Sequence, residues 1–274
     1  MKLCINQSIN KNRGFSLVEL SIVIVIVGLI SAGVVAGGQI VESSKIQAQI
    51  SQLYEYKNAY ESFKQQFNAI PGDFNKAENY WPDATNGNGD RKITNNADDF
   101  NFSARFNDPW FESFRFFEHL SYAGLIDQKF SDSWALNVGY PELALSKGRG
   151  MAAAGRIQDR GGNLQLSDAA RTKQYTAFLA LNISKPNENR RSLYNDLMGT
   201  SSPKFYRSID IKIDDGHANG GFFGAYTSNI TDWGNIPGDP YDPQYERNCL
   251  DAIDGNYMPA NKALVCHGFF ILER

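Results

Sequence analysis

The chain has 274 residues, of which 42% are hydrophobic and 21% are charged. An intrinsically disordered protein is excluded, because such chains combine low apolar content with high net charge, whereas the formal net charge here is −3. The near balance of 27 basic and 30 acidic residues gives no compositional support for binding nucleic acid. Three cysteines are too few for a disulfide-dense scaffold, and their spacing fits no zinc motif.

The apolar residues are concentrated near the N-terminus. A polar stretch containing Lys2, Lys11 and Arg13 precedes a run at about 20–41 that has 22 residues without a charge. A helix of that length would be about 33 Å long, which is about the thickness of a bilayer core. We therefore expect one transmembrane helix there, with its basic flank in the cytoplasm and the rest of the chain across the membrane.

An ordinary secretory signal peptide or a simple membrane anchor would also explain this segment. Val34, Val35 and Ala36 offer a possible signal-peptidase site after a basic start. Glu19 argues against the signal peptide, because it places a carboxylate at the beginning of the apolar run. A charge at bilayer depth costs about 2.5–3.5 kcal/mol on insertion scales, so an acid in that position is a functional hypothesis by default.

The residues around Glu19 carry a family resemblance. The run RGFSLVEL at 13–20, followed by SIVIVIVGLI, resembles the prepilin signature of type IV pilins and type II secretion pseudopilins. In that family a membrane peptidase cuts after the glycine and methylates the new N-terminal amine. The resemblance implies a leader peptide at 1–14, cleavage between Gly14 and Phe15, N-methylation of Phe15, and Glu19 as the fifth residue of the mature chain.

The resemblance also implies a function and a location. It predicts a structural subunit, not an enzyme, of a type IV pilus or a type II secretion pseudopilus. Its partners would be prepilin peptidase, an inner-membrane assembly platform, and copies of itself and other pilin-like subunits in a helical filament. The subunit would first span the inner membrane once with its head in the periplasm. It would then enter a periplasmic pseudopilus or a cell-surface pilus.

Glu19 has a physical role in such a filament. Cleavage creates an ammonium group at Phe15, and Glu19 of one subunit can neutralise the amine of a neighbour in a medium of low dielectric constant. Loss of the leader removes three basic residues, so the mature charge becomes 24 − 30 = −6. Many pilins and major pseudopilins carry proline where this chain has Ala36, and Gly37 and Gly38 could supply flexibility instead.

The helix is expected to continue beyond the membrane to about residue 67. An apolar stripe at helical spacing predicts this continuation, and Pro71-Gly72 ends it. The stripe consists of Ile46, Ile50, Leu53, Tyr60, Phe63 and Phe67. We therefore predict an α+β, pilin-like fold. A long helix over 15–67 would pack on a head over 68–274 that contains an antiparallel sheet.

The head is expected to mix helices and strands. A loop at 72–106 should precede a helix that starts at Asn107-Asp108-Pro109 and closes near Gly124. The segment 191–198 is a candidate short helix, and 140–170 and 230–262 have the character of insertions. Alternating apolar residues predict four strands, at 174–183, 208–216, 220–228 and 267–274. The alternation of Ile209, Ile211 and Ile213 before Asp215-Gly216 favours a hairpin between the second and third of these strands.

Two groups of head residues carry chemistry. Cys249 and Cys266 are expected to form a disulfide, because a head outside the cytoplasm lies where disulfides persist and many type IV pilins have a C-terminal disulfide loop. Two free buried thiols are the alternative. Asn86, Asn88 and Asp90 resemble the start of an EF-hand-type calcium loop, although Arg91 replaces the usual glycine. Calcium is thus a possible cofactor, while turn formation explains the same residues. Asp214-Asp215 is a second acidic cluster, and a hairpin turn explains it as well as a calcium site does.

No catalytic motif accompanies these groups. His119, His217 and His267 lie far apart in sequence, and the chain has no Gly-x-Ser-x-Gly, His-Glu-x-x-His or phosphate-binding glycine loop. Two other classes of function remain open. One is a secreted soluble periplasmic binding protein with an ordinary signal peptide. The other is a membrane-anchored periplasmic enzyme. Between pseudopilin and pilin, the acidic, loop-rich head with its possible calcium site favours the pseudopilin.

Overall fold

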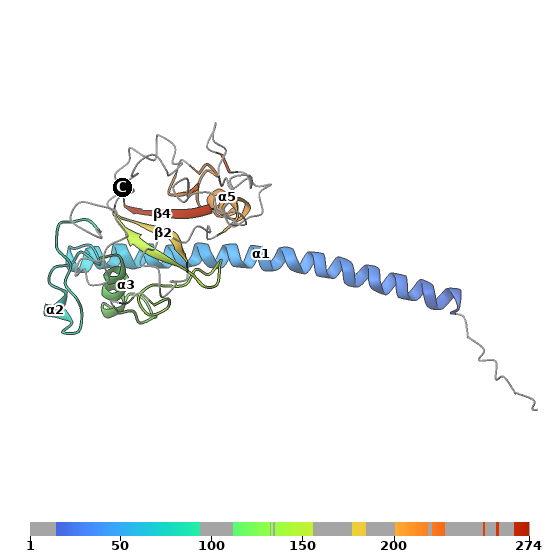
Figure 1. The fold of residues 1–274 in the computed structure, drawn as a ribbon, viewed down its shortest axis with the longest axis horizontal. Helices are drawn as coiled ribbons and strands as arrows, with labels where there is room; N and C mark the ends of the chain where they lie inside the picture. Colours follow the sequence, from blue (N-terminus) through green and yellow to red (C-terminus); the bar gives the residue numbers. More distant parts are fainter. Residues whose placement is uncertain are drawn as a thin grey trace, which may run out of the picture. The chain divides into compact units, whose positions relative to one another are not determined.

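The computed structural model describes residues 15–93, 112–131, 133, 135–155, 177–184, 201–218, 221–227, 249, 256–257 and 266–273. A long N-terminal helix and a small antiparallel sheet in the C-terminal part give the α+β, pilin-like layout that the sequence predicts (Figure 1). The chain divides into two compact units, Met1–Ser44 and Lys45–Arg274, which are described separately below. The helices are α1 (Leu17–Phe67), α2 (Ala77–Tyr80), α3 (Glu112–Tyr122) and α5 (Pro203–Ile213), and the strands are β1 (Arg149–Ala154), β2 (Ala177–Ser184), β3 (Phe223–Thr227) and β4 (Cys266–Glu273).

The first unit contains the apolar half of α1. The large apolar side chains of this segment, from Leu17 to Val41, are solvent-exposed within the chain. Placing so many β-branched and aliphatic residues in water is unfavourable, so this surface requires lipid or other protein around it. Within the described residues, α1 is the one helix long and apolar enough to cross a membrane, and signal sequences share these properties.

In the second unit, the later half of α1 forms one wall of the hydrophobic core. The predicted stripe is confirmed, since Ile46, Ile50, Leu53, Tyr60 and Phe63 are all buried. Successive members are three, four or seven residues apart, which keeps them on one face of a helix. This face packs against both α3 and the sheet: Tyr56 meets Phe117 of α3 and Tyr54 meets Phe270 of β4, with ring centroids 5.2 and 5.6 Å apart.

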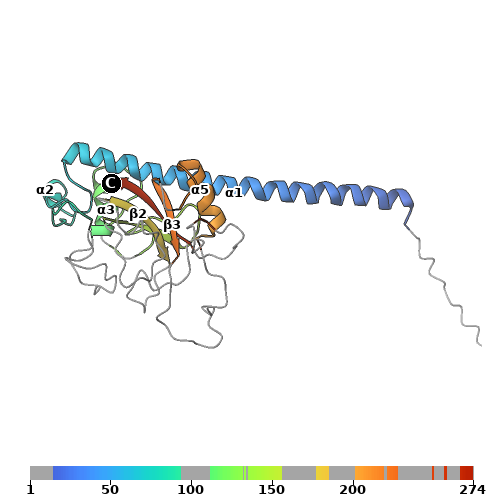
Figure 2. The same ribbon diagram turned by 90° about the horizontal axis from the view of Figure 1, so that it is seen from above.

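The sheet has four strands in the order β1-β2-β4-β3, and each neighbouring pair is antiparallel. The predicted strands at 174–183, 220–228 and 267–274 correspond to β2, β3 and β4. β4 lies between β2 and β3, so the C-terminal strand is central in the order. Figure 2 shows the sheet beside the second half of α1.

The prediction of a strand at 208–216 is wrong, because most of this segment belongs to helix α5. Pro203 occupies the first turn of α5, where its fixed φ favours a helix. The buried residues Tyr206, Ile209 and Asp210 follow a helical spacing, whereas Ile211 is exposed. The isoleucines therefore alternate with the period of a strand, but the residues that are buried follow the period of a helix. The predicted hairpin is absent as well, because β3 pairs with β4.

The segment 140–170, which has the character of an insertion in the sequence, contains β1, and β1 pairs with β2 apart from an irregularity between Gly150 and Ala152. Its small residues Ala152, Ala153 and Ala154 are buried, and α3 packs against this strand. Ser113 of α3 donates its hydroxyl to the carbonyl oxygen of Ala153 at 2.5 Å. The predicted helix near 107–124 thus contains α3, and the loop at 72–106 contains the short α2. The candidate helix at 191–198 lies outside the described residues.

Two glutamines of α1 bind the segment that precedes β1. The buried Gln49 accepts the backbone N–H of Leu145 at 3.1 Å. Gln52 accepts the N–H of Ala144 at 3.1 Å and donates to the carbonyl of Glu142 at 2.7 Å. The side chains also bond to each other, as Gln49 donates to Gln52 at 3.1 Å. Buried amides that are fully paired in this way fix the position of this segment on α1.

Candidate functional site

The start of α1 is closed by a reciprocal pair of hydrogen bonds between Ser16 and Glu19. The backbone N–H of Ser16 donates to the Glu19 carboxylate at 2.8 Å, and the N–H of Glu19 donates to the Ser16 hydroxyl oxygen at 3.2 Å. This is a capping box, in which a serine before the helix and a glutamate three residues later satisfy two helix-terminal N–H groups. The sequence analysis assigned Ser16 no role, although the spacing Ser-x-x-Glu before an apolar run would have identified it.

The geometry places Glu19 next to the residue expected to become the N-terminus. Phe15 lies two residues before the first residue of α1 and is 90% exposed, while Gly14 and the leader at 1–14 lie outside the described residues. Glu19 is exposed within its own chain, so its carboxylate can be reached by a cation from outside. Negative charge in the first turn of a helix is favourable, because the helix dipole is positive at its N-terminus. The local fold therefore presents an acid at the end of an apolar helix.

The missing proline leaves no break in this helix. Ala36, Gly37 and Gly38 are all helical, and no atom outside the local helix lies within 4 Å of the positions that a Cβ would take at the two glycines. Gly28 and Gly33 are equally open. These four glycines therefore leave room on the helix surface for another backbone to approach closely.

The expected disulfide between Cys249 and Cys266 is present in the structure. The two Cα atoms are 5.0 Å apart, and both residues are fully buried. Cys266 begins β4 and also pairs with Ser201 just before α5. The bond therefore ties the central strand of the sheet to a segment 17 residues earlier in the sequence.

The calcium prediction can be compared with the local contacts of its three residues. The side-chain oxygens of Asn86, Asn88 and Asp90 accept backbone N–H groups of Glu78, Asp90 and Lys92, respectively, at 2.8–3.1 Å. Contacts of this kind are typical of turns formed by asparagine and aspartate. The structure thus places the three residues in one loop and gives one side-chain oxygen of each a backbone partner, while calcium binding stays a prediction.

Asp73 organises the same loop and was not anticipated from the sequence. Its nearly buried carboxylate accepts the backbone N–H groups of Gly89, Asp90 and Arg91 at 2.6, 3.0 and 2.8 Å. Burial raises the pKa of Asp73 to about 6 despite these hydrogen bonds. Carboxyl oxygens of Asp73, Asp90 and Glu112 lie within 4.8 Å of one another, which is close enough for a shared cation. Three backbone N–H groups already bind the Asp73 carboxylate without a cation.

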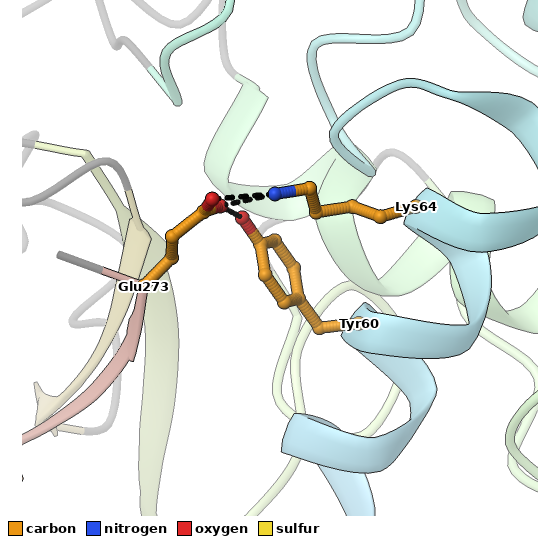
Figure 3. A network of polar contacts seen from close by, with 3 residues as sticks. All are labelled: Tyr60, Lys64 and Glu273. Carbon is orange, nitrogen blue, oxygen red and sulfur yellow. Dashed lines mark hydrogen bonds and ion pairs between the residues drawn. The ribbon is translucent and has the colours of Figure 1, made fainter.

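A polar network ties β4 to the end of α1. Lys64 of α1 places its Nζ 2.5 and 2.6 Å from the two carboxylate oxygens of Glu273, and the Tyr60 hydroxyl donates to the same carboxylate (Figure 3). Burial alone would raise the pKa of Glu273, but the hydrogen bonds from Lys64 and Tyr60 outweigh it and lower that pKa. The groups are about one-third exposed, so the network is structural and partly screened by solvent.

The histidines show no catalytic arrangement in the part of the chain that the structure describes. His119 is buried, accepts the N–H of Gly72 at Nδ1 and donates from Nε2 to the carbonyl of Thr85. Burial and the nearby Arg115 charge lower the pKa of His119 to about 4, so its imidazole is neutral at pH 7. Its two hydrogen bonds fix the position of the backbone that follows α1. His217 lies on the surface beside Asn256, and the side chain of His267 lies outside the described residues.

Comparison with known proteins gives one match. Residues 9–35 match the family model of the prokaryotic N-terminal methylation motif. No curated protein and no solved structure matches the chain. The matched segment contains the expected cleavage site, Ser16 and Glu19, and most of the exposed apolar run. The chain therefore carries the prepilin-type N-terminal signature of type IV pilins and pseudopilins.

Proposed function

We propose that this protein is a pilin or pseudopilin subunit that is processed at Gly14–Phe15 and assembled into a helical filament. The observation that carries the proposal is Glu19, which stands in the matched signature at the start of an exposed apolar helix. In a simple membrane anchor, an acid at that position would have no function. In a filament of processed subunits, it can bind an N-terminal amine. In that filament, Glu19 pairs with the methylated N-terminal amine of a neighbour.

The exposed apolar surface between Leu17 and Val41 has to be covered at every stage of assembly. In a membrane this surface is covered by lipid, and in a filament it is covered by the same surface of other subunits. Apolar packing of this kind is not selective about axial position. The charge pair adds selectivity, because an unpaired acid or amine inside the filament core would be costly.

The subunit acts first as a single-pass inner-membrane protein with its head in the periplasm. Prepilin peptidase removes residues 1–14, and an inner-membrane platform then adds the subunit to the filament. The disulfide between Cys249 and Cys266 supports a head outside the cytoplasm, because such bonds persist in oxidising compartments. A mature charge of −6 argues against direct capture of nucleic acid by the head.

We favour a type II secretion pseudopilus over a type IV pilus on the character of the head, which is acidic and rich in loops. No step of the proposed assembly passes through calcium. The proposed role is structural and not enzymatic, as is general for subunits with this signature.

The deciding experiment replaces Glu19 by alanine and measures processing and assembly separately. We expect cleavage to proceed normally and filament yield to fall more than about tenfold, because an unpaired buried charge costs about 3–5 kcal/mol. Glu61→Ala is the matched control, since Glu61 is an exposed acid on the same helix outside the apolar segment. Normal filament yield from Glu19→Ala would refute the assembly role.

N-terminal sequencing of the exported protein tests the processing step independently. A mature chain that begins with N-methylated Phe15 supports the proposal. A chain that begins near Gly37 would instead identify an ordinary secretory signal peptide and a soluble protein. These two measurements separate a filament subunit from both the secreted binding protein and the anchored enzyme.

A further inference from the structure

The end of α5 brings two carboxyl groups into contact. Asp210 lies in the last turn of α5 and is completely buried, and Asp214 follows the helix directly. A carboxyl oxygen of each lies within 4.8 Å of the other, and one of Asp215, on the exposed turn that follows, lies within the same distance. A carboxylate is an acceptor only, so two such groups held this close at a buried site repel each other unless one of them carries a proton.

The remaining contacts of the pair join three separate parts of the head. Asp210 accepts the Tyr257 hydroxyl at 2.7 Å and the backbone N–H of Gly216 at 3.1 Å. Tyr257 lies between the two disulfide cysteines in sequence and is itself nearly buried. The pair therefore connects the end of α5 to the disulfide-bonded segment.

Asp214 makes the connection to the sheet. Its carboxylate accepts the N–H groups of Phe222 and Phe223, where β3 begins, the second at 3.1 Å. Gly221 passes so close that a Cβ there would collide with this carboxylate. Asp214 is thus fixed by β3 and cannot move away from Asp210 without disturbing the start of the strand.

The other titratable groups around the pair come from the same corner of the head. Tyr257 faces Asp210, and Tyr206 of α5 lies near Tyr257, while Asp215 and His217 lie on the exposed turn that follows. Asp215 and His217 are in solvent, where water and salt screen their charges. Burial, followed by the hydrogen bond to Asp214, raises the pKa of Asp210 to about 8. Burial would also raise the pKa of Asp214, but the hydrogen bonds from Asp210, Phe222 and Phe223 outweigh it and lower that pKa.

We propose that Asp210 and Asp214 share a single proton, and that this proton is a pH-sensitive lock between α5, β3 and the disulfide-bonded segment. With the proton in place the pair has one negative charge, which the N–H groups of Phe222 and Phe223 stabilise. Loss of the proton leaves two negative charges in contact at a buried site, which is strongly unfavourable. The carboxylates must then separate, and the corner of the head that they hold together loosens.

The direction of the pH effect follows from the raised pKa. A free aspartate titrates near 3.9, so between about pH 4 and 8 the folded chain holds a proton that the unfolded chain has lost. The contribution of Asp210 is fully present below the lower value and is lost as the pH rises through about 8. Asp73 and His119, with pKa values of about 6 and 4, change charge little between pH 7 and 9, and comparison of the wild type with Asp210→Asn assigns the remaining dependence to Asp210.

The test compares thermal unfolding of the processed full chain in detergent at pH 7 and pH 9. We expect the wild-type melting temperature to fall by about 5 °C between these values, and that of Asp210→Asn to change little. Asparagine is uncharged and has one donor group and one acceptor in place of the two oxygens of Asp210, so its NH₂ can donate to Asp214 as the protonated acid does. Asp215→Asn, on the exposed turn, is the control and should retain the wild-type dependence.

Three results would overturn the lock. One is a wild-type pH dependence in Asp210→Asn. Another is a wild-type chain whose melting temperature does not change between pH 7 and 9. The third is stabilisation of the wild type, and not of Asp210→Asn, by calcium at pH 9, which would show that a cation rather than a proton joins the acids. If Asp210→Asn does not fold, infrared titration of the wild type decides, because a protonated carboxyl signal that disappears near pH 8 is required.

Discussion

Ser16 and Glu19 satisfy each other's hydrogen-bonding groups, with the Ser16 N–H 2.8 Å from the Glu19 carboxylate. The acid proposed to pair with a neighbouring subunit is therefore engaged within its own chain before assembly. Its pairing with an incoming amine competes with, or adds to, this local contact. A carboxylate has two oxygens and room for several donors, so it can accept both.

Replacing Ser16 by alanine tests whether the local contact or the carboxylate itself matters for assembly. We expect Ser16→Ala to weaken the first turn of α1 by about 1 kcal/mol and to leave cleavage intact, because the glutamate remains. Filament yield should stay well above that of Glu19→Ala, measured by sedimentation of sheared filaments. Ser21→Ala is the control, since the Ser21 hydroxyl donates to the carbonyl of Val18 within the same helix and lies outside the capping box. Equal defects in Ser16→Ala and Glu19→Ala would show that the capping box is itself the essential feature.

Replacing Glu273 by glutamine tests the link between β4 and α1. The change removes the charge that Lys64 and Tyr60 bind, and we expect a loss of about 1 kcal/mol because the ion pair is partly exposed. That loss corresponds to a melting temperature lower by about 2–4 °C at pH 7. The control is Glu55→Gln, an exposed acid on α1.

The same pair of proteins gives a pH dependence with a defined sign. The pKa of Glu273 is lowered on folding, so its stabilisation is present above its unfolded value of about 4.3 and is lost as the pH falls through the folded value. The difference between wild type and Glu273→Gln should therefore disappear in acid. A difference that is constant down to low pH would show that packing, rather than charge, is what the substitution removes.

Removing the disulfide should destabilise the head more than either surface change. In the chain-entropy model, a bond that closes a loop of this length contributes about 3 kcal/mol. We expect the double variant Cys249→Ser, Cys266→Ser to melt about 6–12 °C below the wild type. Reductant should lower the wild-type melting temperature and leave the double variant unchanged. Equal melting of oxidised and reduced wild type would contradict a stabilising role.

Local patterns predicted the long helix and its signature but not the detailed structure of the head. The stripe from Ile46 to Phe63 was readable because its spacing persists over many turns. The segment around Ile209 was misread because its isoleucines alternate, while burial of Tyr206 and Asp210 depends on β4 and on Tyr257, which are distant in sequence. Gly268 of β4, for example, leaves the space that the Tyr206 ring occupies, since a Cβ there would lie 2.5 Å from that ring.

The candidate sites divide in the same way. The contact between Ser16 and Glu19 spans three residues, so a sequence pattern is enough to predict it. Lys64 and Glu273 are 209 residues apart, and neither has a neighbour in sequence that indicates the other. Asp73 is likewise far from the loop that it holds. Such pairings arise from the packing of the core, and single-sequence periodicity has no information about them.

The glutamines of α1 also affect how heads can crowd together. The segment at 141–145 adds an outer row beyond β1, with Glu142 bridged to Gly150 and the N–H of Leu143 donated to Arg149. If its N–H groups at Ala144 and Leu145 were unpaired, they would form an exposed sheet edge of the kind through which sheets aggregate. Gln52 and Gln49 occupy these two groups. Strand pairing between closely packed copies of this chain is thereby disfavoured at that edge.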